Sequence, residues 1–197
     1  MKPDTDAQPL YEASHPPDGD QTIWTYLPDG PYGSAQQLQG MLAWAAAAPG
    51  AVYYAIVPLP GERPLGVAAF LRITPEFGVI EIGHIWFGPE LQRTTAAPET
   101  IFLLARHAFD ELGYRRLEWK CNALNAASRR AAERFGFTFE GVFAQHQIVK
   151  GRNRDTAWYA ITDRGWPAIR SRFESWLAPE NFDSEGRQRI SLHALMQ

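Results

Sequence analysis

The order of hydrophobic patterns along this chain constrains its fold more than any other feature. Six segments are rich in β-branched and aromatic residues or alternate apolar with polar residues, which predicts strands. These segments are 51–59, 64–73, 79–87, 115–121, 137–149 and 154–162. Helices are predicted over 34–48, 98–112, 125–135 and the stretch from Trp166 to Trp176. This order predicts a mixed α/β sheet with helices on its faces.

The predicted elements form one domain with two flanking segments. The 197 residues are enough for one domain with a substantial core. Residues 1–33 are rich in Pro, Asp and Gly, so we expect them to be mostly irregular. The domain itself is predicted over 34–162. Residues 163–197 are expected to form a C-terminal helix and a polar tail that pack on the same domain.

Composition excludes several classes of function. The formal charge of −3 lacks the basic excess of nucleic-acid-binding proteins, so we expect no nucleic-acid partner. Cys121 is the only cysteine, which excludes an intramolecular disulfide and a four-thiolate zinc site, and we expect no metal. No export signal is present, and no stretch approaches the roughly 20 apolar residues of a membrane helix. We therefore expect a cytoplasmic protein without a membrane partner.

Segment 85–109 holds the clearest chemical feature, because a strand ends, a loop of small residues follows and a helix begins. Amide groups at a helix N-terminus, together with the helix dipole, bind phosphate groups. Neither Thr94 nor Thr95 starts a capping box, so the first amides lack an obvious side-chain partner. A phosphate-bearing ligand could supply that partner. An ordinary loop, whose amides meet Thr hydroxyls or water, is the alternative.

Two motifs resemble those of GNAT N-acetyltransferases. The run Gln-Arg-Thr-Thr-Ala-Ala at 92–97 is similar to the family's pyrophosphate loop, Gln/Arg-x-x-Gly-x-Gly/Ala. Residues 112–141 resemble the RimJ/RimL-like branch, with Asn125-x-x-Ser128 at a helix start and a Gly-Phe pair after the helix. The resemblance spans roughly 24–162 and implies a GNAT fold that transfers an acetyl group from acetyl-CoA to a primary amine. The amine, on a protein N-terminus or a small molecule, is expected to attack directly in a ternary complex.

The chain departs from the family pattern at two places. Thr95 occupies the position of a motif glycine, so the pyrophosphate would approach past a β-branched side chain. The family fold also begins with a strand that pairs with the hairpin, and no strand is predicted before Leu10. We therefore expect a GNAT fold that lacks its first strand and leaves a sheet edge exposed. We also expect the natural start to lie upstream of Met1.

The resemblance implies a set of residues that bind acetyl-CoA. Backbone groups at the end of the third strand pair with the pantetheine arm, and their amides stabilise the developing oxyanion, an effect worth about 3 kcal/mol. Ser128 is similar to the family residue near the thiol, where a hydroxyl could protonate the leaving thiolate. Asn125 is a helix N-cap by position and, by resemblance, a CoA contact. The implied cofactor-binding residues are Ile85, Trp86, Phe87, Gln92, Arg93, Thr94, Thr95, Ala96, Ala97, Asn125, Ser128 and Arg134.

Glu81 and His84 are the candidates for the group that takes a proton from the amine. An amine with a pKa of about 10.4 is protonated at neutral pH and must lose a proton before it attacks. Strict alternation places the two side chains on opposite faces of the strand, so both could serve only if a bulge intervenes. We favour Glu81, because the resemblance implies a carboxylate there. The candidate catalytic set is Glu81, His84 and Ser128, with a structural role as the alternative for each.

Further alternatives stay open from the sequence. The cationic run 150–155 could bind RNA, but its position between two strands predicts a turn at the rim of an acceptor groove. Cys121 is predicted to be a small core residue rather than an acyl-carrying nucleophile. A non-catalytic acyl-CoA-binding or protein-interaction module on the same fold is the alternative function. A homodimer stays open, and segments 28–40 and 143–155, which would set the acceptor, contain no motif that identifies it.

Overall fold

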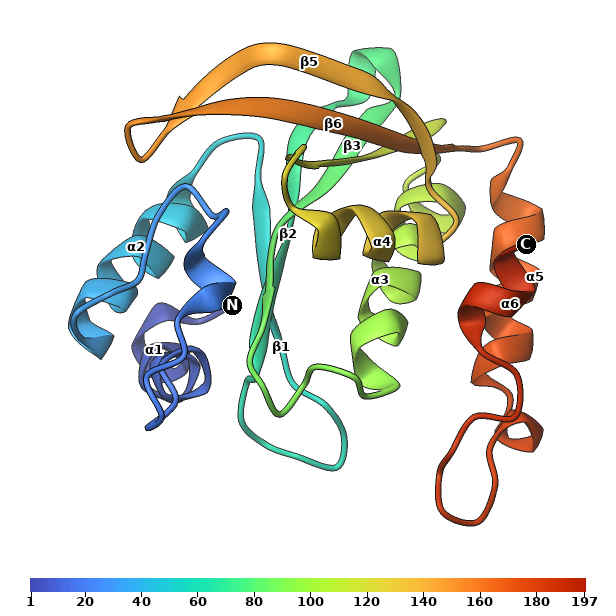
Figure 1. The fold of residues 1–197 in the computed structure, drawn as a ribbon, viewed down its shortest axis with the longest axis horizontal. Coiled ribbons are helices and arrows are strands. Elements are labelled where there is room, and N and C mark those ends of the chain that lie inside the picture. Colours follow the sequence, from blue (N-terminus) through green and yellow to red (C-terminus); the bar gives the residue numbers. More distant parts are fainter.

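A six-stranded mixed sheet forms the centre of the computed structural model, which describes all 197 residues (Figure 1). The strands are β1 (Val52–Ile56), β2 (Gly66–Thr74), β3 (Val79–Phe87), β4 (Arg116–Asn122), β5 (Thr138–Val149) and β6 (Arg152–Thr162). Their order is β1-β2-β3-β4-β6-β5, and only β3 and β4 run parallel. The predicted mixed α/β sheet is confirmed, with every expected strand present.

Helices cover both faces of this sheet (Figure 1). They are α1 (Pro3–Ser14), α2 (Ala35–Ala47), α3 (Ala96–Arg106), α4 (Ala126–Arg134), α5 (Trp166–Leu177) and α6 (Leu192–Met196). In Figure 1, α1 and α2 lie on one side of β1 and β2, and α3, α4 and α5 lie on the other. We call these the α1/α2 face and the α3/α4 face. None of the helices is long and apolar enough to cross a membrane.

Each face has its own hydrophobic core. On the α3/α4 face, strand residues such as Phe70 and Leu117 pack with Ile101 of α3 and Phe173 of α5. The smaller core on the α1/α2 face comprises Ala7, Leu10, Trp24, Leu27, Leu38, Leu42, Val67 and Trp86. The sheet is therefore fixed from both sides, and its strand ends are held in place for a functional site.

Helix α1 corrects the expectation that residues 1–33 are mostly irregular. A proline at its first position suits a helix start, but Pro9 lies inside the helix and removes a backbone hydrogen bond. The helix forms nevertheless because Ala7 and Leu10 are buried against the rest of the molecule. Packing of an apolar side outweighs local propensity here.

Three other differences from the predicted elements are small. Helix α3 begins at Ala96, two residues before its predicted start, and continues through a π-helical turn at His107–Glu111. The predicted polar tail contains the short helix α6. No strand precedes β1, and β1 pairs only with β2, so it forms the edge of the sheet as expected.

Candidate active site

Strands β3 and β4 separate after a short parallel pairing. Three residue pairs join them, from Val79 with Arg116 to Glu81 with Glu118. Beyond these pairs both strands continue, β3 to Phe87 and β4 to Asn122, without further pairing between them. The backbone of β3 over 82–87 thus faces an opening in the sheet rather than a neighbouring strand. An opening of this kind can admit an extended ligand that pairs with the free edge.

A β-bulge lies on β3 beside this opening. The pairing with β2 shifts register between Val67 and Ala69, and His84 adopts a left-handed backbone with φ of 46°. After the bulge, Trp86 lies in the core of the α1/α2 face, while Ile85 packs against the core of the α3/α4 face. The bulge therefore changes the alternation along the strand.

The bulge brings Glu81 and His84 to the same face. Glu81 contacts Lys120, which is paired across the sheet with Trp158, and His84 packs edge-on against Tyr53 of β1 at 5.3 Å between ring centroids. Both sets of contacts lie on the α1/α2 face, because Tyr53 is opposite Ala69 and Ala69 is opposite Gly83, two positions from Glu81. Strict alternation is thus wrong for this strand.

The loop before α3 presents free backbone amides. The amides of Thr95, Ala96 and Ala97 donate to no acceptor in the chain, and the Thr95 side chain makes no capping hydrogen bond. Arg93 has a left-handed backbone with φ of 62°, and its exposed side chain has no ion-pair partner. Successive free amides at a helix N-terminus form an anion-binding concavity.

Thr95 does not require the conformational freedom of glycine. Its φ and ψ are −67° and −30°, which any residue adopts, and its side chain is exposed. Gln92 and Thr94 bind within the loop, since Gln92 Nε2 donates to the Phe87 carbonyl at 2.8 Å and Thr94 Oγ1 donates to the Leu91 carbonyl at 2.7 Å. These contacts fix the loop to the end of β3.

The start of α4 lies on the other side of the opening, after β4. Asn125 caps this helix as predicted, because its side chain accepts a hydrogen bond from the Ser128 amide at 3.0 Å. The Ser128 hydroxyl in turn accepts from Trp119 Nε1 of β4 at 3.0 Å. That contact uses an acceptor position of Ser128, and a hydrogen bond from Ser128 opposes the burial that raises the pKa of the Cys121 thiol.

Cys121 and Arg129 have structural environments beside Ser128. Cys121 is buried in the α3/α4 core, as predicted, and burial raises the pKa of its thiol, which disfavours the nucleophilic thiolate. Arg129 donates to the Tyr159 hydroxyl at 3.1 Å and to the Ala123 carbonyl. Arg134, by contrast, is exposed and makes no ion pair. It is therefore free to meet a ligand.

A buried ion-pair cluster lies on the α1/α2 face beside the opening. Lys120 Nζ is 2.5 Å from Glu81 Oε2 and 3.3 Å from Glu118 Oε2, and both the Lys120 and Glu81 side chains are less than a tenth exposed. Arg72 approaches Glu81 from outside at 3.8 Å, and Lys120 lies over the Trp158 ring. Burial raises the pKa of Glu81, while the Lys120 charge opposes that rise.

Six more buried polar atoms on or against this face have no hydrogen-bond partner in the chain. They are Asp29 Oδ1, Tyr32 OH, His84 Nε2, Trp86 Nε1, Arg154 Nε and Trp158 Nε1. Folded proteins pair nearly all such groups, and their concentration on one face is typical of a site that binds a polar ligand. Asp29, Tyr32, Lys120 and Trp158 are absent from the residues predicted from the sequence. Among them only Lys120 has a recognisable signal, a charged residue in a central strand.

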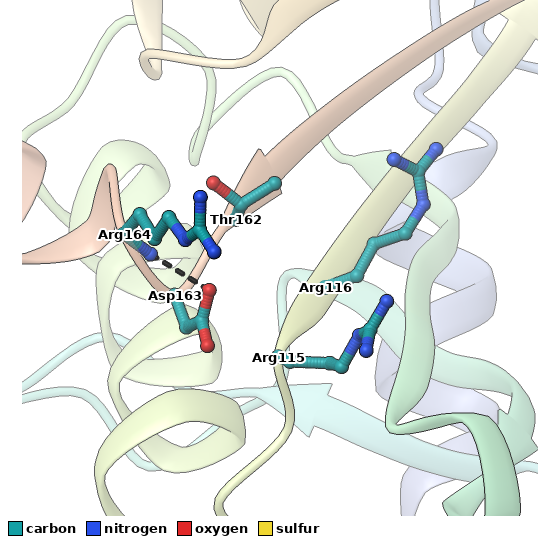
Figure 2. Close-up of a pocket in the computed structure, with 5 residues that line it drawn as sticks. All are labelled: Arg115, Arg116, Thr162, Asp163 and Arg164. Atoms are coloured by element: carbon teal, nitrogen blue, oxygen red, sulfur yellow. Dashed lines mark hydrogen bonds between the residues drawn. The ribbon is translucent and has the colours of Figure 1, made fainter.

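A separate polar pocket lies at the far end of the sheet, where β3 and β4 are still paired (Figure 2). It measures about 420 Å³ and is lined by Arg115, Arg116, Thr162, Asp163 and Arg164. In Figure 2, Arg115 and Arg116 extend away from Asp163 and Arg164. Arg116 is also neutralised by Glu118 and Glu140. These side chains do not converge on one ligand, so the opening between β3 and β4 is the candidate active site.

Comparisons with known proteins agree with this geometry. The family description of an acetyltransferase (GNAT) domain matches residues 1–138. A GCN5-related N-acetyltransferase from Brucella melitensis is 44% identical with a TM-score of 0.93, and the match covers 98% of this chain and 87% of that one. A "probable acetyltransferase" of the GNAT family from Chromobacterium violaceum ATCC 12472 is 38% identical with a TM-score of 0.80, covering 85% and 82% of the two chains.

More distant structures share the fold. A spermidine N-acetyltransferase from Vibrio cholerae, in complex with CoA and spermine, is 17% identical with a TM-score of 0.65, and the match covers 82% of this chain and 92% of that one. No protein of curated function matches the sequence. The family match, which covers well over half of the chain, and the solved relatives lead to one conclusion: this chain belongs to the GNAT family of acetyl-CoA-dependent N-acetyltransferases.

Proposed function

We propose that this protein acetylates a primary amine, on a protein N-terminus or a small molecule, by direct attack of the amine on acetyl-CoA. One observation carries the proposal: the free edge of β3 over 82–87 leads directly into the loop of unpaired amides before α3. One extended ligand with a pyrophosphate at one end and a thioester at the other fits both features. By motif we assign the chain to the RimJ/RimL-like branch.

In this proposal acetyl-CoA lies along the opening between β3 and β4. The amides at 95–97 hold the pyrophosphate, and Arg93 of the same loop and Arg134 of α4 are the cations without an ion-pair partner that would meet the CoA phosphates. The pantetheine arm pairs with the backbone at 85–87, and an amide there stabilises the oxyanion. Ser128 protonates the leaving thiolate. The spermidine N-acetyltransferase of Vibrio cholerae, which shares the fold, is in complex with CoA, which supports CoA as the ligand of this fold.

His84 is the better proton acceptor of the two candidates. Burial lowers the pKa of His84, so its imidazole is neutral and able to accept a proton at pH 7. Glu81 is ion-paired with Lys120, and the Lys120 charge disfavours proton uptake by this carboxylate. The sequence-based preference for Glu81 therefore gives way to His84, with Glu81 as the carboxylate that holds Lys120 in place.

The test is an acceptor screen that detects free CoA and the acetylated product by mass spectrometry. We expect product with at least one of four acceptor classes: N-terminal peptides, amino acids, polyamines and aminoglycosides. His84→Gln should lose most of the activity, and Glu81→Gln serves as its comparison. Binding of acetyl-CoA without CoA release from any acceptor would refute an enzyme and favour a non-catalytic acyl-CoA-binding module.

We also propose a cytoplasmic location for the protein. Its single cysteine is a free, buried thiol, which fits a reducing compartment. Fractionation of cells with an antibody against the native protein would test the location, and recovery in the periplasmic fraction would contradict it.

A further inference from the structure

The segment that connects α1 to α2 places one acidic side chain, Asp29, beside His84. Asp29 Oδ1 lies 3.8 Å from His84 Nε2, a separation too long for a direct hydrogen bond. Both atoms are buried and without a hydrogen-bond partner, and the His84 side chain is only 6% exposed. The hydroxyl of Tyr32, three residues along, is also buried, and its contact with Asp29 adds to the burial that raises the pKa of Tyr32. Three buried polar groups from two distant parts of the chain thus meet at the bulge of β3.

The charge of Asp29 affects the pKa of three neighbouring side chains, those of His84, Tyr32 and Tyr53. Its charge opposes the burial that lowers the pKa of His84. It also adds to the burial that raises the pKa of both Tyr32 and Tyr53. Lys150 bears a further cation nearby, but its Nζ donates to the Trp24 carbonyl at 2.9 Å. Asp29 therefore has no lysine or arginine within ion-pair distance, although the charge of Lys150 acts on it from farther away.

Other carboxylates on this face are already neutralised. Glu81, Glu118 and Glu140 are each within ion-pair distance of a lysine or arginine. Arg154, whose Nε is buried, has no carboxylate partner, which adds positive charge to the surroundings. Among the carboxylates named here, Asp29 is the one that has no lysine or arginine within ion-pair distance. Arg72, Lys120 and Arg154 place positive charge on the same face, which disfavours a second ammonium group.

We propose that the acceptor amine binds between Asp29 Oδ1 and His84 Nε2, with the Tyr32 hydroxyl as a third contact, and that this site selects an acceptor with a single cationic amine. The proposal rests on the function proposed above. A nitrogen about 2.9 Å from each of two atoms 3.8 Å apart meets both at hydrogen-bonding distance. Asp29 holds the ammonium group, and His84 removes a proton from it.

The transfer balances with these groups. The ammonium loses one proton to His84 Nε2 and becomes a neutral amine. Its nitrogen attacks the thioester carbonyl, the new C–N bond forms, and the C–S bond breaks. Ser128 gives its proton to the CoA thiolate and receives the second proton lost by the nitrogen, and the third stays on the amide. Imidazolium at His84 then releases its proton to solvent.

The test compares Asp29→Asn, which keeps the side-chain shape, with Asp18→Asn, an exposed aspartate of the same connecting segment. Steady-state kinetics are measured with the best monoamine of a panel that includes 2-phenylethylamine and a tripeptide, and with spermine. We expect Asp29→Asn to raise the acceptor KM about tenfold or more, because a charged hydrogen bond is lost. The KM for acetyl-CoA should stay the same, and Asp18→Asn should behave like the parent. Thermal unfolding checks that both variants fold.

A second measurement needs no turnover. NMR titration of the free protein gives the pKa of His84, and Asp29→Asn should lower it further, because the Asp29 charge opposes the effect of burial. Isothermal calorimetry with 2-phenylethylamine and 2-phenylethanol on the CoA-loaded protein should show binding of the amine alone. If no acceptor is turned over, the proposed function fails while these two readouts still decide the site. Equal acceptor KM in both aspartate variants, an unmoved His84 pKa, or a preference for spermine over every monoamine would overturn the proposal.

Discussion

At the scale of single residues, the ion pair of Lys120 and Glu81 is costly to bury, and it fixes the positions of both side chains. Both side chains are less than a tenth exposed, and their contact at 2.5 Å offsets the loss of hydration of two charges. Either charge, buried without its partner, would destabilise the folded protein. The Lys120 charge also disfavours proton uptake by Glu81, which is why we assign proton transfer to His84 at the bulge.

Replacement of Lys120 by methionine should therefore destabilise the protein by about 3 kcal/mol or more, because Glu81 is left buried without its partner. The pKa of Glu81 should rise further, since the Lys120 charge now lowers it. Urea unfolding gives the free energy of unfolding, and the double variant Lys120→Met/Glu81→Gln should recover part of the loss. A loss within the roughly 1 kcal/mol of an exposed ion pair would contradict the buried pairing.

The pH dependence of the reaction separates the two candidate bases. Burial lowers the pKa of His84, so the residue stays neutral as pH falls below about 6.5, its ordinary pKa, and gains a proton only at lower pH. We expect kcat/KM to fall on the acid side below that value. Glu81→Gln should leave this acid limb in place, and His84→Gln should abolish it. Loss of the limb in Glu81→Gln alone would return the role to the carboxylate.

At the scale of elements, the sequence predicted what depends on local chemistry. Asn125 as a cap needs only its neighbours, and the turn at Lys150 and Gly151 has positive φ at both residues, as a tight hairpin turn requires. Helix α1 and the placement of Asp29 were not predictable, because both depend on packing against distant residues. The bulge at His84 likewise has no local signal, and it decides which side chains share a face.

The N-terminus of α3 gives a prediction in which stability and affinity change in opposite directions. Thr95→Asp places a negative charge next to free helix amides, which should stabilise the protein by about 0.5 kcal/mol through the helix dipole. The same charge repels a pyrophosphate, so the KM for acetyl-CoA should rise about tenfold. Thr95→Asn adds no charge and serves as the control. An unchanged KM in Thr95→Asp would place the pyrophosphate elsewhere.

At the scale of the whole molecule, segments far apart in the sequence enclose the α1/α2 face. The tip of the β5–β6 hairpin reaches toward the N-terminal part of the chain (Figure 1), where Lys150 Nζ donates to the Trp24 carbonyl. The Tyr26 hydroxyl donates to the Leu124 carbonyl before α4 at 3.2 Å. Through these contacts the connection between α1 and α2 is fixed to the β4–β6 side of the opening.

Lys150→Met should loosen this enclosure without unfolding the protein, because it removes one hydrogen bond, worth about 1 kcal/mol. Hydrogen exchange of residues 22–33 should become faster, and the acceptor KM should rise severalfold while the KM for acetyl-CoA stays constant. Arg152→Met, an exposed change at the same turn, is the matched control. Identical exchange in the two variants would show that the Lys150 contact does not hold the segment.

The short pairing of β3 with β4 has a mechanical consequence. Three residue pairs connect β1–β3 to β4–β6 at the centre of the sheet, so a short pairing joins two halves of three strands each. We call the two halves plates and the junction between them the seam. A co-substrate that binds to both plates holds them together, and its binding free energy adds to the stability of the folded protein. Acetyl-CoA should thus raise the melting temperature and slow exchange at the inner edges of both plates. Stabilisation without slower exchange there would mean that the ligand binds to one plate alone.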